Sequence, residues 1–189
     1  ANLVWDIPNL EKKIYLTFDD GPHPEITPWV LEQLKKHNAK ATFFCVGSNI
    51  EKYPEICRKI IAEGHCIGNH TYSHLNGWKT SNEKYIEDVN KCDYRLPITL
   101  FRPPYGKITP NQYSIIAKKY SIILWDVLSK DYDNTCTGEQ CYEQVIKKTK
   151  PGSVIVFHDS EKAYDHLQYA LPRTLEFYSN KGFVLTSIT

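Results

Sequence analysis

Two histidines and an aspartate in this chain have the spacing and context of metal ligands. His70 and His74 are four positions apart in the segment HTYSH, so one helical turn would place both imidazoles on the same face. Asp20 follows an apolar run in the segment TFDDGP and would complete a set of two histidines and one carboxylate. Such a set leaves positions open for water and substrate, as a catalytic metal requires. Taken alone, HxxxH could equally be a surface pair.

Three further residues could hold or move a proton. Asp19 precedes Asp20, and adjacent strand side chains point to opposite faces, so the two carboxylates can do different work; a turn or capping pair is the simpler interpretation. Arg102 stands before two prolines in RPPYG. That rigid loop could fix the guanidinium on a carboxylate or aim a backbone N–H at an oxyanion, or be an ordinary proline turn. His158 follows an apolar run and could donate a proton near neutral pH, although a hydrogen-bonded structural histidine is the simpler interpretation.

The elements that must position these residues alternate between strand and helix patterns. Strands are predicted over residues 13–18, 41–46, 65–68, 99–102, 121–126, 153–157 and 183–186, and helices over 27–37, 54–63, 83–96, 110–119, 139–148 and 169–179. This alternation indicates a parallel sheet with crossover helices. Seven units in 189 residues indicate short connections and a small, incomplete barrel. Residues 1–189 are expected to form one domain.

Polar residues follow most of these predicted strands, at the end where sites gather in parallel α/β folds. They are Asp19-Asp20, Asn69-His70, Arg102, Asp126 with Asp131, and His158-Asp159. One such residue would mean little, but five sets on one rim are hard to explain by packing. We therefore expect these side chains to share a site. The remaining histidines are interpreted as structural, with His23 the least secure because it adjoins DDGP; they are His23, His37, His65 and His166.

Composition excludes some classes of function. The 23 basic and 22 acidic residues give a net charge of +1, so no basic face for nucleic acid is indicated. No apolar run approaches the roughly 18 residues needed to span a bilayer. No signal peptide is visible, and the chain starts at Ala1 and contains no methionine, which is compatible with a removed leader or a trimmed chain. Aromatic residues, at 13%, suit sugar stacking as well as packing at the core edge.

The six cysteines allow 15 full pairings. Cys136 and Cys141 flank Thr-Gly-Glu-Gln, which makes a small disulfide loop plausible. Cys45 and Cys66 lie in apolar runs and are predicted to be buried free thiols. Because no CxxC pair is present, a structural zinc site on cysteine is not expected.

The segments TFDDGP, HTYSH, RPPYG and a strand ending in FHD occur in this order. In this respect the chain resembles the polysaccharide deacetylases of the NodB-homology type, carbohydrate esterase family 4, from about residue 12 to residue 189. The resemblance implies a distorted (β/α)7 barrel. It also implies a metal-dependent hydrolase that removes acetyl groups from polysaccharide containing N-acetylglucosamine, such as chitin oligomers or peptidoglycan. The metal would be divalent, zinc by preference, with cobalt or nickel as alternatives. We expect a monomer in the cell envelope or outside the cytoplasm, because such substrates lie there.

The resemblance also implies roles for individual residues. Asp19 would be the catalytic base, oriented by Arg102. The metal ligands would be Asp20, His70 and His74.

Further roles concern the substrate. The backbone N–H of Tyr105 would face the oxyanion, and His158 would be the general acid. Val156 would line the pocket for the acetyl methyl group, where the family usually has leucine. Pro104 and Tyr105 would border the sugar.

One motif departs from the family pattern. The family often has Asp-x-x-Asp-Trp after the fifth strand, but here Leu128 and Tyr132 replace the first acid and the tryptophan. Asp131 is retained and is expected to orient His158, with Asp126 as a less favoured substitute. Tyr132 can still supply an aromatic wall for a sugar. The change bears on substrate preference more than on reaction type.

Three alternatives remain open at this point. The first is O-deacetylation of an acetylated xylan-type polymer. The second is an inactive carbohydrate-binding homologue, which only the altered motif supports. The third is an unrelated metal-binding module, which would not explain Asp19, Arg102 and His158 together.

Overall fold

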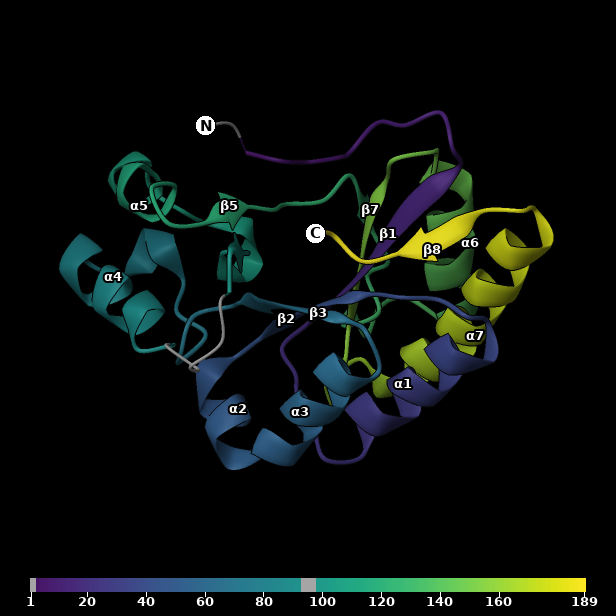
Figure 1. Ribbon diagram of the computed structural model, residues 1–189, viewed down its shortest axis with the longest axis horizontal. Helices are drawn as coiled ribbons and strands as arrows, with labels where there is room; N and C mark the ends of the chain where they lie inside the picture. Colours follow the sequence, from purple (N-terminus) through teal and green to yellow (C-terminus); the bar gives the residue numbers. More distant parts are fainter. Residues whose placement is uncertain (1–2, 93–97) are drawn as a thin grey trace.

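A curved sheet of parallel strands forms the centre of the molecule (Figure 1). The computed structural model describes residues 3–92 and 98–189. The strands follow the order β5-β4-β3-β2-β1-β7-β6, and β8 pairs with the first half of β1. Within the described residues β5 and β6 end the path without pairing with each other, so the sheet is a half-barrel. The strands are β1 Lys13–Asp19, β2 Thr42–Cys45, β3 Cys66–Asn69, β4 Leu100–Phe101, β5 Ser121–Ile122, β6 Val127–Leu128, β7 Val154–His158 and β8 Val184–Thr186.

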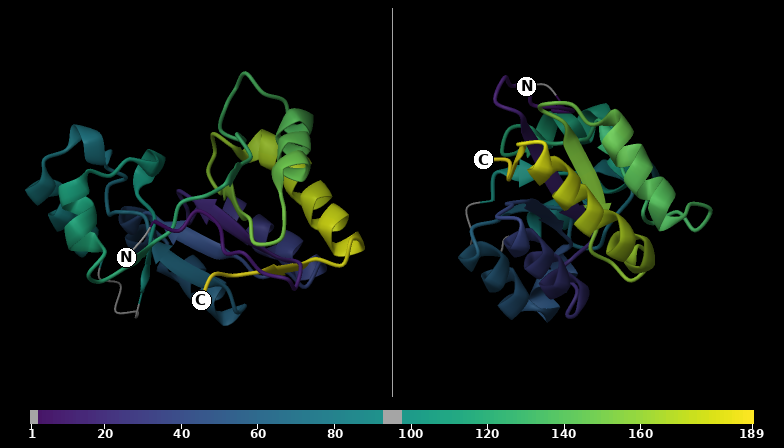
Figure 2. Two further views of the ribbon diagram at one scale, coloured as in Figure 1. Left: turned by 90° about the horizontal axis from the view of Figure 1, so that it is seen from above. Right: turned by 90° about the vertical axis from the view of Figure 1, so that its right-hand side faces the viewer.

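Helices cover the outside of this sheet. Figures 1 and 2 show α6 and α7 grouped at one end of the molecule and α4 and α5 at the other. Two short 3-10 helices, η1 and η2, belong to the connections around β3 and β4. The helices are α1 Ile26–Lys36, α2 Gly47–Lys52, α3 Pro54–Ala62, η1 Gly77–Lys79, α4 Asn82–Asn90, η2 Pro104–Gly106, α5 Pro110–Ile116, α6 Gly138–Lys148 and α7 Tyr164–Asn180. In the described part of the chain, none of them combines the length and the apolar character that crossing a membrane would need.

The two faces of β1 do different work because strand side chains alternate. Ile14, Leu16 and Phe18 are fully buried against the helices. The ring of Phe18 stacks on Phe43 of β2 and Phe157 of β7, with centroids 5.1 and 6.1 Å away. Burying each such side chain stabilises the fold by roughly 1.5–3 kcal/mol. The other face of β1 therefore turns Asp19 toward the barrel interior.

The observed elements confirm the predicted α/β class and the distorted barrel, with differences at individual elements. Of the predicted strand 121–126 only Ser121–Ile122 forms a strand, β5, and β6, Val127–Leu128, was not predicted. Helix α2 was not predicted, and α7 begins at Tyr164, five residues before the predicted start. The helix predicted over 83–96 ends at Asn90, and residues 93–96 of that prediction lie outside the described residues.

The segment before β1 is also part of the sheet. Val4 forms a parallel bridge with Ile123, and Asp6 forms an antiparallel bridge with Ser153. The Val4 N–H donates to Ile122 O at 3.0 Å, and Leu124 N–H donates to Val4 O at 2.7 Å. These residues therefore lie across the opening between β5 and the start of β7.

The predicted disulfide between Cys136 and Cys141 is wrong, because both thiols are free. Thr137 caps α6 through a capping box with Gln140. Cys136 and Cys141 thus occupy the positions just before the cap and in the second turn, where apolar side chains pack on each other. Cys45 is a buried free thiol as predicted, whereas Cys66 is only half-buried.

Candidate active site

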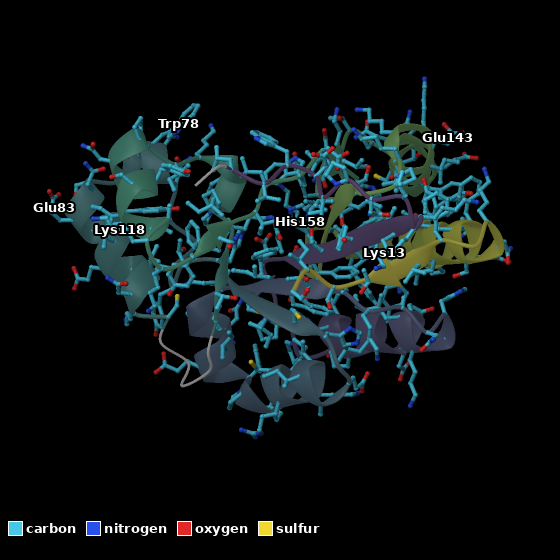
Figure 3. The ribbon with its side chains drawn as sticks, turned by 45° about the horizontal axis from the view of Figure 1, so that its top comes forward. Lys13, Trp78, Glu83, Lys118, Glu143 and His158 are labelled. Atoms are coloured by element: carbon cyan, nitrogen blue, oxygen red, sulfur yellow. The ribbon has the colours of Figure 1, made fainter. Side chains whose placement is uncertain are left out.

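One pocket collects side chains from the carboxyl ends of β1, β3 and β7 and from the loops after β4, β5 and β6. Its volume is about 360 Å³. Figure 3 shows His158 near the centre of the molecule, between the two groups of helices. The lining residues are Asp19, Asp20, His70, His74, Tyr105, Trp125, Leu128, Tyr132, Val156, His158 and Lys162. Eight of the site residues named in the sequence analysis therefore share one cavity with Trp125, Leu128 and Lys162.

A buried ion pair forms the floor of this pocket. Arg102 Nη1 donates to Asp19 Oδ1 at 2.7 Å, and Asp19 is only 4% exposed. The guanidinium also donates to Thr17 Oγ1 at 2.6 Å and to the carbonyls of Ile123 and Leu124 at 3.1 and 2.8 Å. A fully buried charge requires such complete pairing. The arginine is therefore immobile, and it fixes one carboxylate oxygen of Asp19.

The predicted metal ligands converge on one point. The ligand atoms of Asp20, His70 and His74 all lie within 4.8 Å of one another. Asp20 Oδ1 is 3.0 Å from His74 Nε2 and 3.6 Å from His70 Nε2. His70 Nδ1 lies 2.7 Å from the carbonyl oxygen of Arg102. A carbonyl can only accept, so Nδ1 carries a proton and Nε2 is the ring nitrogen that faces the carboxylate and could share a cation with it. Two imidazoles and one carboxylate are donors that suit Zn²⁺, Co²⁺ or Ni²⁺.

The charge state of Asp20 suits cation binding. Burial acts to raise its pKa, but the hydrogen bonds from His70 and His74 outweigh burial and hold the pKa of Asp20 well below its usual range. The carboxyl is thus ionised at every pH at which the protein would work. The three residues fit a divalent cation.

His158 stands on a different wall of the pocket with a buried partner. Asp131 Oδ1 is 2.7 Å from His158 Nδ1, and Asp131 Oδ2 accepts from the His158 backbone N–H at 2.8 Å. Asp131 is fully buried, and as a carboxylate it accepts from both groups, so Nδ1 of His158 carries a proton. Burial acts to lower the pKa of His158, but the charge of Asp131 and its hydrogen bond raise it to about 9. The imidazole is therefore cationic at neutral pH.

The model of the family described as polysaccharide deacetylase matches residues 6–121, a stretch that holds the first three motifs of the pocket. This chain belongs to the polysaccharide deacetylase family. The resemblance to the NodB-homology, carbohydrate esterase family 4 proteins, inferred from four short motifs, is thereby confirmed.

Two members of the polysaccharide deacetylase family illustrate what this chain is similar to. A peptidoglycan-N-acetylglucosamine deacetylase of Bacillus cereus is 39% identical over 168 residues, which cover 85% of this chain and 60% of that protein. A chitooligosaccharide deacetylase of Azorhizobium caulinodans is 35% identical over 157 residues, which cover 79% of this chain and 74% of that protein. The chain thus spans less than two thirds of the length of the first relative.

A solved member of the polysaccharide deacetylase family has the same fold. The crystal structure of the Bc1960 peptidoglycan N-acetylglucosamine deacetylase, in complex with 4-naphthalen-1-yl-N-oxidanyl-benzamide, superposes with a TM-score of 0.89. The two sequences are 36% identical, and the match covers 98% of this chain and 90% of that chain.

Aromatic and aliphatic side chains complete the pocket. The ring of Tyr105 meets His74 edge-on with centroids 4.8 Å apart, and that of Tyr132 meets His158 in the same way at 5.1 Å. Leu128 and Val156 are directly paired in the β6–β7 ladder, and both line the cavity. In this member of the family the departure at Leu128 therefore adds apolar surface beside Val156.

Two wall residues were missed by sequence reasoning. Trp125 and Lys162 line the pocket, the first from the turn between β5 and β6 and the second from the loop before α7. The ammonium group of Lys162 lies 5.5 Å from the centroid of the Tyr132 ring. Neither residue belongs to a short motif, so only the packing of the loops could have placed them.

Other predicted residues lie outside the pocket lining. Pro104 is buried and is not among the lining residues. Asp126 accepts hydrogen bonds from the Val154 N–H and from the hydroxyl of Ser153 and so is not the partner of His158. His166 Nδ1 contacts the Asp131 backbone carbonyl at 2.8 Å. The other three histidines also lie outside the lining. His23 contacts Glu161, His37 is the C-cap of α1, and the ring of His65 accepts from the Ala41 N–H.

Several residues at the rim hold a left-handed backbone without being glycine. They are Asp20 (φ 81°), Thr71 (61°), His74 (55°), Tyr105 (61°) and Lys130 (61°). Such conformations are costly for these residue types and persist where surrounding contacts impose them. Three of these residues, Asp20, His74 and Tyr105, line the cavity.

Asp159, the neighbour of His158, is a positioning residue that sequence reasoning left without a role. It is 1% exposed; Oδ1 accepts from Gly21 N–H at 3.1 Å, and Oδ2 accepts from Thr27 Oγ1 at 2.6 Å. A Cβ at position 21 would overlap this carboxyl, so Gly21 is required for the close approach. Burial raises the pKa of Asp159 to about 8, with the Thr27 hydrogen bond opposing the rise. The carboxyl thus clamps the turn that carries Asp20.

Substitutions of Asp159 are expected to separate its shape from its charge. Asp159→Asn keeps an oxygen for the Gly21 N–H and can donate to the Thr27 hydroxyl, so metal affinity should change less than roughly threefold. Asp159→Leu leaves both groups buried without a partner and should lower the free energy of unfolding by about 3 kcal/mol. Calorimetric metal titration and thermal unfolding measure both effects. Equal behaviour of the two variants would contradict the clamp.

The metal set makes a separate prediction. Chelator-treated protein titrated with zinc should bind one ion per chain. At free zinc one hundred times the Kd, the free energy of unfolding should rise by about 2.7 kcal/mol. The double variant His70→Ala, His74→Ala should bind none at this site and show no stabilisation, whereas His23→Ala, His37→Ala should behave as wild type. Retention of a full equivalent by the first variant would rule out the site.

Proposed function

We propose that this chain is a divalent-metal-dependent hydrolase that removes the acetyl group from N-acetylglucosamine units of a polysaccharide. One observation carries the proposal. The Asp19–Arg102 pair and the His158–Asp131 pair line or back the same pocket as the Asp20, His70 and His74 set. A base, an acid and a cation site thus surround one cavity.

Asp19 is the proposed base. Arg102 holds one of its carboxylate oxygens at 2.7 Å, and the carboxylate lines the pocket, so it is placed to accept a proton from an attacking water. Because Arg102 is buried and fixed by three other acceptors, the carboxylate has no freedom to turn away. Asp20, His70 and His74 would hold the metal, which we propose to be zinc with cobalt or nickel as alternatives. When bound, such an ion supplies Lewis acidity toward a carbonyl or a water molecule.

His158 is the proposed acid. An amide nitrogen leaves poorly unless it is protonated, so hydrolysis of an acetamide requires a proton donor. With a pKa of about 9, the imidazolium is protonated at neutral pH, and Asp131 keeps Nδ1 occupied so that Nε2 carries the proton to be donated. The products are acetate and a free amino sugar.

The other walls suit an N-acetylated sugar. The left-handed backbone at Tyr105 would direct its N–H at the developing oxyanion. Removing one such donor typically raises the activation barrier by about 2.7–4 kcal/mol. Val156, with Leu128 beside it, would receive the acetyl methyl group. Tyr105 and Tyr132 would border the sugar ring.

The relatives support the substrate class, because they are named for peptidoglycan N-acetylglucosamine and chitooligosaccharides. The N-oxidanyl amide of the compound bound to the solved relative is a bidentate oxygen ligand of the kind that metal ions bind, which agrees with the proposed metal. We further propose that residues 1–189 form one domain, that the protein acts as a monomer, and that it works in the cell envelope or outside the cytoplasm, where these polymers lie.

Acetate release tests the proposal. Zinc-loaded protein is incubated with N-acetylglucosamine oligomers, with peptidoglycan and, in parallel, with acetylated xylan. Release from the first two supports N-deacetylation. Release from xylan alone would make the protein an O-acetyl esterase, and a smaller penalty for His158→Ala is then expected because an alkoxide leaves more easily than an amine. Release from none of them would leave an inactive carbohydrate-binding homologue.

A further inference from the structure

Trp78 is the most exposed tryptophan in the described part of the chain, with 65% of its surface in solvent, and it lies outside the pocket. In Figure 3 it stands toward the end of the molecule that carries α4 and α5, away from His158. Scattered exposed apolar residues are normal on protein surfaces. Exposure alone therefore gives this residue no role.

The indole of Trp78 is, however, held rigidly. Its Nε1–H donates to Ile108 O at 3.2 Å, and its backbone N–H donates to Asn76 Oδ1 at 3.0 Å. Gln112, which is fully buried, donates to Gly77 O at 2.9 Å. A Cβ at Gly77 would overlap Lys107 O, so η1 lies directly against the loop after η2. The Trp78 indole is thus exposed to solvent and already immobilised before a ligand binds.

Both segments that hold this ring lead into the pocket. Trp78 is four residues after His74, and its indole is bonded to Ile108, three residues after Tyr105. Three residues span at most about 11 Å. Tyr105 is itself 59% exposed and lines the pocket. Two exposed aromatic rings therefore stand along one pair of loops, the first at the pocket and the second farther out.

The surroundings of Trp78 suit a sugar ring. The face of an aromatic ring is the negative part of its quadrupole, and it attracts the C–H groups on one face of a pyranose. Little conformational entropy is lost on binding when the aromatic side chain is already fixed. Lys107 Nζ lies over one face of the Trp78 ring, 5.0 Å from its centroid, so a sugar would stack on the other face, and the ammonium would border the stacked unit. A polymer with one acetamide in the pocket would continue past Tyr105 toward this ring.

We propose that Trp78, with Lys107, forms an outer subsite that stacks a sugar unit of the polysaccharide chain several rings away from the unit being deacetylated. The inference rests on the proposed function for its substrate. It makes Trp78 a determinant of chain-length preference rather than of the reaction, because the residue touches neither the ligands nor the acid and base.

Oligomer binding and turnover test the subsite with two independent readouts. Calorimetry measures the affinity of the N-acetylglucosamine dimer and hexamer for wild type, Trp78→Ala, Trp78→Phe and the control Trp5→Ala, which removes another tryptophan, 52% exposed. Trp78→Ala should weaken hexamer binding by roughly three- to tenfold, the range for a stacking contact, and leave dimer binding unchanged. Trp78→Phe should recover most of the loss, and Trp5→Ala should have no effect.

Acetate release from the same oligomers separates this proposal from the proposed function. The loss in Trp78→Ala should fall on KM for the hexamer, with kcat unchanged. Absence of acetate release from wild type would overturn the function, while the binding measurements would still decide the subsite. Equal loss for dimer and hexamer, an unchanged hexamer affinity, or no hexamer binding by wild type would each overturn the subsite.

Discussion

Replacing Asp19 with asparagine is expected to lower kcat for acetate release by two to four orders of magnitude, the usual contribution of a positioned general base. Asparagine has the shape of aspartate and can still accept from Arg102, so the pocket should keep its form. What it loses is the ability to take a proton. The three metal ligands are untouched, so the variant should still bind one zinc ion.

The same substitution has a second, separable effect on stability. It leaves the fully buried guanidinium of Arg102 without a counter-charge, and breaking a buried pair in this way costs about 3–5 kcal/mol. A melting temperature lower by roughly 10 °C should result for a chain of this size. Activity is therefore compared at a temperature at which circular dichroism shows both proteins folded. Asp165→Asn, a change at an exposed carboxyl of α7, is the matched control.

Near-wild-type turnover by folded, zinc-loaded Asp19→Asn would remove the base from the proposal. A loss of activity accompanied by a loss of zinc would instead indicate that the turn carrying Asp20 had moved. Each outcome points to a different part of the pocket.

Replacing Asp131 with asparagine is expected to shift the alkaline limit of activity to lower pH. In wild type the charge of Asp131 and its hydrogen bond are the largest influences that raise the pKa of His158 to about 9, so the acid stays protonated through pH 8. Without that charge, burial lowers the pKa of His158 and only the weaker influence of Asp19 and Asp20 still raises it. At pH 8 most of the variant should then have an unprotonated His158, and turnover should fall by roughly tenfold. A pH profile of kcat at fixed zinc measures the shift.

Unfolding provides an independent check on the same pair. A group whose pKa is higher in the folded protein stabilises it fully below the unfolded pKa, and this stabilisation disappears as the pH rises through the folded value. For His158 the window runs from about 6.5 to about 9, and the contribution is about 3 kcal/mol. As the pH rises from about 6.5 to about 9, the free energy of unfolding of wild type should fall by this amount relative to that of Asp131→Asn. Parallel stability curves for the two proteins would contradict the raised pKa.

The strand ends made the pocket predictable from sequence. Asp19, Asp20 and His158 each follow an apolar run long enough to be recognised as a strand, and parallel strands bring such ends to one edge. The spacing of the two histidines in HxxxH and the two prolines in RPPYG each restrict the local backbone geometry. The family resemblance then supplied the roles, which remain proposals for this chain.

The parts that could not be predicted depend on contacts between distant segments. Strand β6 has two residues, too few for any periodicity to register, and it exists because Leu128 pairs with Val156. Trp125 and Lys162 reach the pocket from loops whose paths follow from the packing of neighbouring elements. Asp159 acts on Gly21 from 138 positions away. The disulfide prediction failed because Cys136 and Cys141 flank the capped start of α6, where they serve as apolar side chains with free thiols.

The hydrogen bonds of Val4 to the β5 edge bear on how this protein can be engineered. The carbonyls of Ile123 and Leu124 that grip Arg102 belong to the backbone stretch that Val4 bridges. A substitution that breaks the Val4 hydrogen bonds would therefore disturb the guanidinium under Asp19 without entering the pocket.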